Sequence, residues 1–238
     1  RTFPQHHLRS FVPLNGTWEF LPECDRKPRS GQLPRTYTRQ AEIPMPWESM
    51  PDLRGYRGVG WYRKSFTLKQ PGSVRLAFGG VSHTAEVWVN GVSVGSHYDA
   101  FTPWEVLVRD LAAGTHQVVV KVDNTFGEHS SLHLPNDYYT YGGITRPVEL
   151  QIIPDLFLHK LFAVPRKVKT GWNLEVRVRV RNLGRKTSGA AVQLRLDGVE
   201  QTIALPEVYA GNTVEVSGVL KGLKVKPWSE TAPRLYLL

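Results

Sequence analysis

The feature that most constrains how this chain folds is an alternation of apolar and polar residues, cut at short intervals by turn residues. An apolar residue at every second position is typical of a β-strand, whereas an amphipathic helix repeats every three to four residues. The clearest case is segment 84–95, where alternating valines flank Asn90-Gly91, the pair preferred in tight hairpin turns. The sequence therefore predicts an all-β fold.

The same pattern continues along the chain with a change of texture after Pro154-Asp155. Before that point, strands are predicted at 16–20, 61–68, 74–78, 104–108, 116–122 and 148–153, spaced as in a β-sandwich. After it, aromatic residues become fewer, and the apolar residues of 174–180 alternate with charged ones, as on a strand with one wet face. We expect a first domain over 1–154 and a second over 155–238. About 80 residues with six or seven short strands fit an immunoglobulin-like sandwich.

Length and composition agree with two folded domains in a soluble chain. The 238 residues are 41% hydrophobic and 21% charged, and no apolar run approaches the ~20 residues that a membrane span needs. We therefore expect no membrane partner. Cys24 is the only cysteine, which excludes an intramolecular disulfide. The chain starts at Arg1 without an apolar signal core, so we expect that the original N-terminus was removed.

Seven phrases, in this order, carry a family resemblance. They are Leu-Asn-Gly-Thr-Trp-Glu-Phe (14–20), Ile-Pro-Met-Pro-Trp (43–47), Gly-Trp-Tyr-Arg-Lys-Ser-Phe (60–66), Arg-Leu-Ala-Phe-Gly-Gly-Val-Ser-His-Thr-Ala-Glu-Val-Trp-Val-Asn-Gly (75–91), Phe-Thr-Pro (101–103), Asp-Tyr-Tyr-Thr-Tyr-Gly-Gly-Ile-Thr-Arg-Pro-Val-Glu-Leu (137–150) and Pro-Trp-Ser-Glu-Thr-Ala-Pro-Arg-Leu-Tyr (227–236). Together they resemble the N-terminal domains of family 2 glycoside hydrolases, which include β-glucuronidases and β-galactosidases. The resemblance implies a sugar-binding, galactose-binding-like jelly-roll β-sandwich over 1–154 and an immunoglobulin-like β-sandwich over 155–238. It also implies a parent protein that hydrolyses terminal β-glycosides.

The catalytic residues that the resemblance implies are missing from this chain. Retaining glycosidases use two carboxyl groups ~5 Å apart. In this family both belong to glutamates on a (β/α)₈ barrel, and the acid/base follows an asparagine. The sequence has no Asn-Glu dipeptide, and after the phrase at 227–236 it has no room for the roughly 250 residues of a barrel. We therefore expect the chain alone to be inactive, with the C-terminal barrel as its missing partner.

Asp137 is the candidate substrate-binding residue. It lies in an aromatic, turn-rich segment (134–143), where an aspartate commonly forms an Asx-turn. The resemblance implies a second role, because the aspartate at this position in the family extends into the barrel pocket and binds substrate hydroxyls. Tyr138, Tyr139 and Tyr141 either supply a stacking surface beside it or pack beneath the loop.

A metal site is the alternative interpretation of the same segment. His129, His133 and Asp137 follow one another at intervals of four, as ligands on one face of a helix would. Pro135 and the surrounding turn formers oppose such a helix. We therefore expect neither a metal nor a cofactor.

The sequence leaves two other classes of function open. A stand-alone carbohydrate-binding module would use exposed aromatic residues as platforms, although Trp61 and Trp88 lie in strand patterns typical of packed residues. The net charge of +9 suggests nucleic acid, but the arginines of 177–181 alternate as on a solvated strand face, so we expect no such partner. The identity of the sugar stays open, as does homo-oligomerisation. Val59 stands where the galactosidase branch carries an asparagine, which counts against a galactoside.

Overall fold

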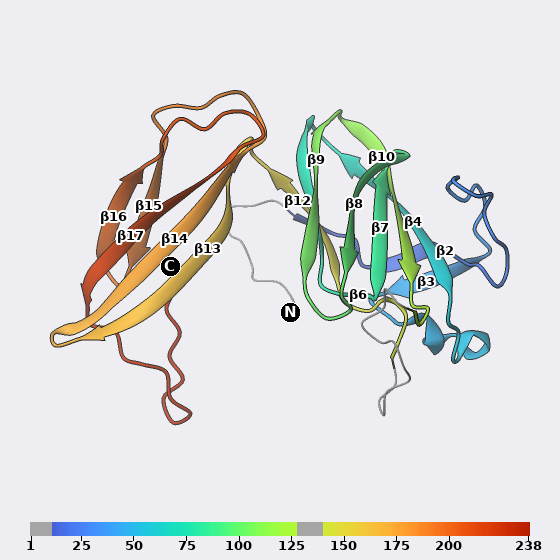
Figure 1. The fold of residues 1–238 in the computed structure, drawn as a ribbon, viewed down its shortest axis with the longest axis horizontal. Helices are drawn as coiled ribbons and strands as arrows, with labels where there is room; N and C mark the ends of the chain where they lie inside the picture. The colour runs from blue at the N-terminus through green and yellow to red at the C-terminus, as the bar shows by residue number, and fades with distance from the viewer. Residues whose placement is uncertain (1–10, 128–139) are drawn as a thin grey trace. The chain divides into compact units, whose positions relative to one another are not determined.

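The structure of the chain is a computed structural model that describes residues 11–127 and 140–238. The chain divides into two compact units, 1–153 and 154–238 (Figure 1). In the described residues the regular structure consists of β-strands and two 3₁₀ turns, Trp47–Ser49 (η1) and Pro51–Leu53 (η2). This confirms the predicted all-β fold class. Neither described helix has the length or the apolar composition to cross a membrane.

Unit 1 contains two large antiparallel sheets. The four-stranded sheet has the order β1 (Phe11–Pro13), β12 (Val148–Ile153), β5 (Gly72–Phe78), β9 (Trp104–Leu111). The six-stranded sheet has the order β3 (Arg39–Ile43), β2 (Gly16–Pro22), β4 (Val59–Leu68), β10 (Gly114–Asp123), β7 (Thr84–Val89), β8 (Val92–Tyr98). A short pair joins β6 (Val81–Ser82) to β11 (Gly143–Ile144). All the strands predicted before residue 154 are present.

The predicted hairpin at Asn90-Gly91 is formed by β7 and β8. Val89 pairs with Val92 across the turn. Asn90 and Gly91 both have positive φ, 50° and 82°, as a type I′ turn requires. The hairpin joins the six-stranded sheet through β10.

The core of unit 1 combines apolar side chains of both large sheets. Because successive side chains of a strand point to opposite faces, the apolar residues at alternate positions of β2, β4, β10 and β7 enter this core. The contributors from the six-stranded sheet include Trp18, Phe20, Tyr62, Val87, Val118 and Val120, and those from the four-stranded sheet include Val74, Leu76, Phe78, Val106 and Leu150. The residues between them project to the opposite, outer face of the six-stranded sheet.

Unit 2 has its own core, and its two sheets have fewer strands than the two large sheets of unit 1. A three-stranded sheet has the order β13 (Leu156–Val168), β14 (Gly171–Asn182), β17 (Thr213–Leu223), and a two-stranded sheet pairs β15 (Ala191–Leu196) with β16 (Val199–Ala204). The prediction of six or seven short strands is therefore wrong, because this fully described unit has five. The reason is that β13 and β14 run for 13 and 12 residues, whereas segments 183–190 and 205–212 form only the bridge between Thr187 and Val208.

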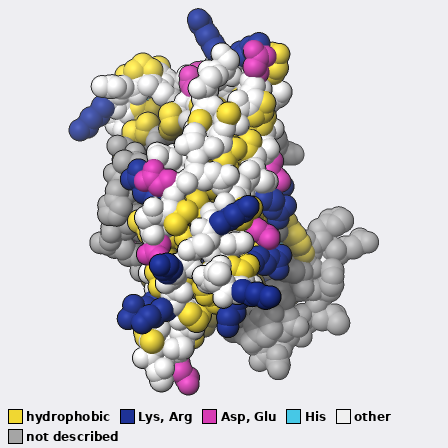
Figure 2. Space-filling view, turned by 90° about the vertical axis from the view of Figure 1, so that its left-hand side faces the viewer, with side chains coloured by type: hydrophobic (Ala, Val, Ile, Leu, Met, Phe, Trp, Pro, Cys, Tyr) yellow, Lys and Arg dark blue, Asp and Glu magenta, His cyan; other side chains and the backbone are white. Residues whose placement is uncertain are grey.

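The wet face predicted for β14 is confirmed. Leu174 and Val176 are buried, whereas Glu175, Arg177 and Arg179 are exposed. Both arginines lie near the Glu215 carboxylate of β17, at 3.8 and 2.8 Å. Figure 2 shows one side of the molecule, over which Lys and Arg side chains are dispersed with acidic side chains among them. Such mixed charge is typical of an ordinary solvated surface.

Candidate functional site

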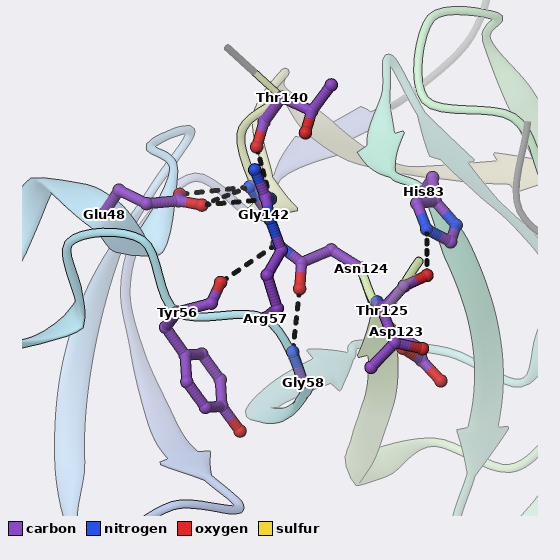
Figure 3. Close-up of polar contacts among 10 residues, drawn as sticks. All are labelled: Glu48, Tyr56, Arg57, Gly58, His83, Asp123, Asn124, Thr125, Thr140 and Gly142. Atoms are coloured by element: carbon purple, nitrogen blue, oxygen red, sulfur yellow. Dashed lines mark hydrogen bonds and ion pairs between the residues drawn. The ribbon is translucent and has the colours of Figure 1, made fainter. Parts of the chain in front are cut away.

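The candidate residue Asp137 lies outside the described residues, as do Tyr138, Tyr139, His129 and His133. The structure describes both flanks of that segment, up to residue 127 and from residue 140. A group of polar contacts fixes these flanks to unit 1, as Figure 3 shows. We call the residues at its centre the loop anchor: Glu48, Arg57, Asn124 and Gly142.

Asn124 holds the flank that leaves β10. It is 2% exposed, and an amide so deeply buried needs partners for its oxygen and its nitrogen. Its Oδ1 accepts from the Gly58 amide (2.9 Å), and its Nδ2 donates to the Tyr56 carbonyl (3.3 Å). Its backbone amide donates to the Gly58 carbonyl (3.1 Å). The first flank is thus tied to residues 56–58.

The next residue, Thr125, is fixed by two neighbouring side chains. The Asp123 carboxylate accepts from the Thr125 amide (2.8 Å) and hydroxyl (2.7 Å). His83 Nε2 lies 3.1 Å from the Thr125 carbonyl, and Nδ1 lies 3.0 Å from the Thr84 hydroxyl. A carbonyl can only accept, so Nε2 carries the proton. Burial lowers the pKa of His83, opposed mainly by this contact with Thr125, so the ring is neutral near pH 7.

Gly142 holds the flank that follows residue 139. Its amide donates to both carboxylate oxygens of Glu48, at 3.0 Å each, and its carbonyl accepts from the Trp47 amide at 3.0 Å. A Cβ at this position would lie 2.2 Å from the Trp47 ring and 2.4 Å from Asn124 Nδ2. Only glycine fits here without displacing buried atoms.

Arg57 connects the two flanks. Its Nη1 donates to the Thr140 carbonyl (2.5 Å), and its guanidinium lies 4.8 Å from the centre of the Phe126 ring. The same nitrogen lies 3.9 Å from a Glu48 oxygen. One side chain therefore contacts Phe126 on one flank, Thr140 on the other, and the carboxylate that anchors the second flank.

Glu48 is a buried carboxyl group, with its side chain 4% exposed. Burial raises the pKa of Glu48, and the Gly142 amide and the Arg57 charge oppose this shift. Both of its oxygens accept from the Gly142 amide. The contacts engage Glu48 in holding backbone, which suits a positioning role better than a nucleophilic one.

Metal chemistry has no support in the described part of unit 1 or unit 2. Within residues 11–127 and 140–238, no group of three His, Cys, Asp or Glu side chains could hold an ion. The histidines of the alternative metal interpretation lie outside these residues. What the loop anchor can do is fix the two ends of the segment that carries Asp137.

The structure also describes other residues that the sequence analysis names, and they differ in their exposure and contacts. Tyr141 is 52% exposed. Arg146 donates to the Phe101 carbonyl at 2.9 Å. Val59 is half-buried in β4, opposite Asp123. Trp61 is buried, as its strand pattern predicts, whereas Trp88 is half-buried.

Sequence reasoning did not identify Glu48, Arg57 and Asn124 as functional. One signal was present: Gly142-Gly143 beside a candidate functional loop indicates a close approach of backbone to another group. The sequence does not reveal the identity of that group, because Glu48 precedes Gly142 by 94 positions.

Comparison with known proteins gives one consistent result. Residues 32–154 match the family model for the sugar binding domain of glycosyl hydrolases family 2. The β-galactosidase of Streptococcus thermophilus is 30% identical over 80% of the chain, and the β-glucuronidase of Paenibacillus borealis is 28% identical over 67%. The solved structure of a β-galacturonidase from Eisenbergiella tayi is 35% identical over 99% of the chain, with a TM-score of 0.85.

The chain is much shorter than these relatives. It spans 19% of the S. thermophilus protein, 32% of the P. borealis protein and 41% of the E. tayi chain. The matches therefore cover between 67% and 99% of this chain but less than half of each relative.

Replacing Gly142 with alanine tests how tightly the second flank is held. The added Cβ would meet the buried Trp47 ring, so Gly142→Ala should lower the free energy of unfolding by about 1 to 3 kcal/mol. Urea denaturation followed by tryptophan fluorescence measures this. Gly72→Ala is the matched control, since a Cβ there would lie 4.0 Å from its nearest neighbour, Ile152 Cγ2. Equal stability of the two variants would show that the contact is loose.

Replacing Glu48 with glutamine tests the buried charge. The folded-state pKa of Glu48 is raised, so its contribution to stability is present below its unfolded pKa of about 4.3 and is lost as the pH rises through the folded pKa. Glutamine keeps an acceptor for Gly142 but cannot ionise. The stability of Glu48→Gln relative to wild type should therefore increase as the pH rises above about 4. Urea titrations at stepped pH, with the exposed Glu230→Gln as control, measure it; a flat or falling difference contradicts the prediction.

Proposed function

The chain belongs to glycoside hydrolase family 2, and we propose that it is the non-catalytic portion of a retaining glycosidase that hydrolyses terminal β-glycosides. In this proposal, residues 1–154 form a sugar-binding jelly-roll domain and residues 155–238 an immunoglobulin-like β-sandwich domain. The partner is a (β/α)₈ barrel that carries the catalytic glutamates. The alternative is a stand-alone carbohydrate-binding module.

The observation that carries this proposal is the pattern of coverage. A β-galacturonidase chain contains a region 35% identical to 99% of this chain, and this region is 41% of its length. The match covers nearly all of this chain but less than half of the relative. This supports the proposal that the chain is a portion of a larger glycosidase. A stand-alone module would explain the family membership equally well but not the relatives' extra length.

We propose that Asp137 is the residue of this chain that contacts the substrate. An ionised carboxylate can accept hydrogen bonds from two sugar hydroxyls at once. The loop anchor supports the proposal, because Arg57 contacts the Thr140 carbonyl and the Phe126 ring on either side of the segment. Fixing both ends of a loop before binding reduces the entropy lost when substrate is bound.

For the sugar we propose a β-uronide, either a galacturonide or a glucuronide. The E. tayi enzyme is named a β-galacturonidase, and one of its structures is bound to galacturonate. The P. borealis relative is named a β-glucuronidase. Val59 at the position of the asparagine in the galactosidase branch supports the same choice over a galactoside.

The chain alone should hydrolyse no aryl glycoside, because it has no Asn-Glu dipeptide and no barrel. The assay uses the purified 238-residue chain with chromogenic glucuronide, galacturonide, galactoside and mannoside. Release of chromophore above the uncatalysed rate, persisting through purification to homogeneity, would contradict the prediction.

Asp137→Ala in the parent glycosidase should lower kcat/KM by roughly tenfold to a thousandfold, since hydrogen bonds to a charged group contribute about 1.5 to 3 kcal/mol each. Thermal unfolding should be unchanged, because a loop carboxylate contributes little to the core. The control is Glu200→Ala, which removes an exposed carboxylate of the β15–β16 hairpin. Full activity of the Asp137 variant would remove Asp137 from the substrate site.

A further inference from the structure

We propose that the outer face of the six-stranded sheet binds an oligosaccharide that carries carboxylate groups. An open groove of about 600 Å³ lies there, between segment 23–35 and the turn of the β7–β8 hairpin. This volume is within the range of small-molecule sites. We call it the outer groove; the residues that matter for the argument are Arg29, Arg35, Trp61, Glu86, Trp88 and Lys121.

Strand alternation places these side chains on one face. Tyr62, Val87 and Val120 enter the core of unit 1, so their neighbours Trp61, Trp88 and Lys121 point the other way. The register then sets them side by side, because Lys121 pairs with Trp61 on β4 and with Glu86 on β7. The groove floor is therefore built on three adjacent strands of a rigid sheet.

Two tryptophans form the aromatic part of the floor. Their ring centres lie 5.7 Å apart, with an interplanar angle of 34°. Trp61 is 7% exposed, and its Nε1 donates to Glu23 at 3.0 Å, so it supports the floor from below. Segment 23–38 packs Leu33 and Tyr37 against this cluster but leaves Trp88 half-buried and lining the groove. A sugar ring has an apolar C–H face that packs on an indole.

Polar groups stand beside the aromatic floor, as recognition of a sugar requires. Lys121 Nζ lies 2.8 Å from a Glu86 oxygen and 5.8 Å from the centre of the Trp61 ring. An ammonium donates hydrogen bonds and a carboxylate accepts them, so the pair can bond hydroxyls of either orientation. Aromatic surface with a few convergent polar groups is the usual composition of a small-molecule site.

The charge of the groove favours an acidic ligand. Its two carboxylates are engaged, Glu23 by Trp61 and Glu86 by Lys121. Arg29 and Arg35, on segment 23–38 at the right-hand side of Figure 1, are exposed, and neither has an ion pair within the described residues. A guanidinium binds a carboxylate through two parallel hydrogen bonds. A uronic acid unit stacked on Trp88 would supply that carboxylate, whereas a neutral sugar would leave both arginines without a partner.

This inference does not depend on the proposed glycosidase function. A glycan site on the outer sheet would serve a glycosidase and a stand-alone module equally. Its test therefore uses binding by the 238-residue chain and no hydrolysis.

Isothermal titration calorimetry with trigalacturonate and with neutral α-1,4-galactotriose, which has the same linkage but no carboxylates, tests the proposal. Trigalacturonate should bind more tightly, and its affinity should fall as NaCl is raised. Trp88→Ala should weaken binding by about tenfold or more, as loss of an aromatic anchor does. Arg29→Ala/Arg35→Ala should abolish the preference for the acidic trisaccharide.

Matched variants control for surface changes. Trp228→Ala removes a tryptophan that is 60% exposed in unit 2, and Arg54→Ala/Arg109→Ala removes two exposed arginines of unit 1; both should bind as wild type does. Circular dichroism checks that Trp88→Ala folds, and if it does not, the arginine variant on the exposed segment decides the question. No binding of trigalacturonate, equal binding of the neutral trisaccharide, or binding unchanged by the groove variants would overturn the proposal.

Discussion

In the described part of unit 1, the structure around the candidate loop depends on one constraint. This constraint is the burial of Trp47 together with its neighbour Glu48. Trp47 is 1% exposed, and glycines from two other segments make room for it. A Cβ on Gly60 or Gly142 would approach its ring to 2.7 or 2.2 Å. Burying the Glu48 carboxylate beside it is costly unless hydrogen bonds compensate. The Gly142 amide supplies them, so packing and hydrogen bonding fix the same point of backbone.

This arrangement explains how unit 1 fixes the two flanks of the segment that carries Asp137. Functional side chains often lie on loops that a rigid scaffold positions. Here Asn124 ties one flank to residues 56–58, and Gly142 ties the other to Glu48. Arg57 contacts both flanks. The loop anchor therefore provides position, and the proposed substrate contact at Asp137 uses it.

The six-stranded sheet has two faces with different surroundings, and strand alternation separates them. Alternation along β4, β7 and β10 places Tyr62, Val87 and Val120 in the core. The same alternation places Trp61, Trp88 and Lys121 under segment 23–38, where the outer groove forms. The pattern reveals which residues share a face, but it does not reveal that a distant segment folds over that face and leaves Trp88 partly open.

The sequence by itself determined the all-β class, six of the strands before residue 154, the hairpin at Asn90-Gly91 and, through its phrases, the family. These features are local, because strand periodicity and turn dihedral angles depend on residues close together in the chain. Only the tertiary structure decided the number of strands in unit 2, the strand order of the sheets and the loop anchor. Glu48 and Gly142 are 94 positions apart, and Arg57 and Thr140 are 83 apart. Such contacts arise from packing across the whole unit, which no local pattern specifies.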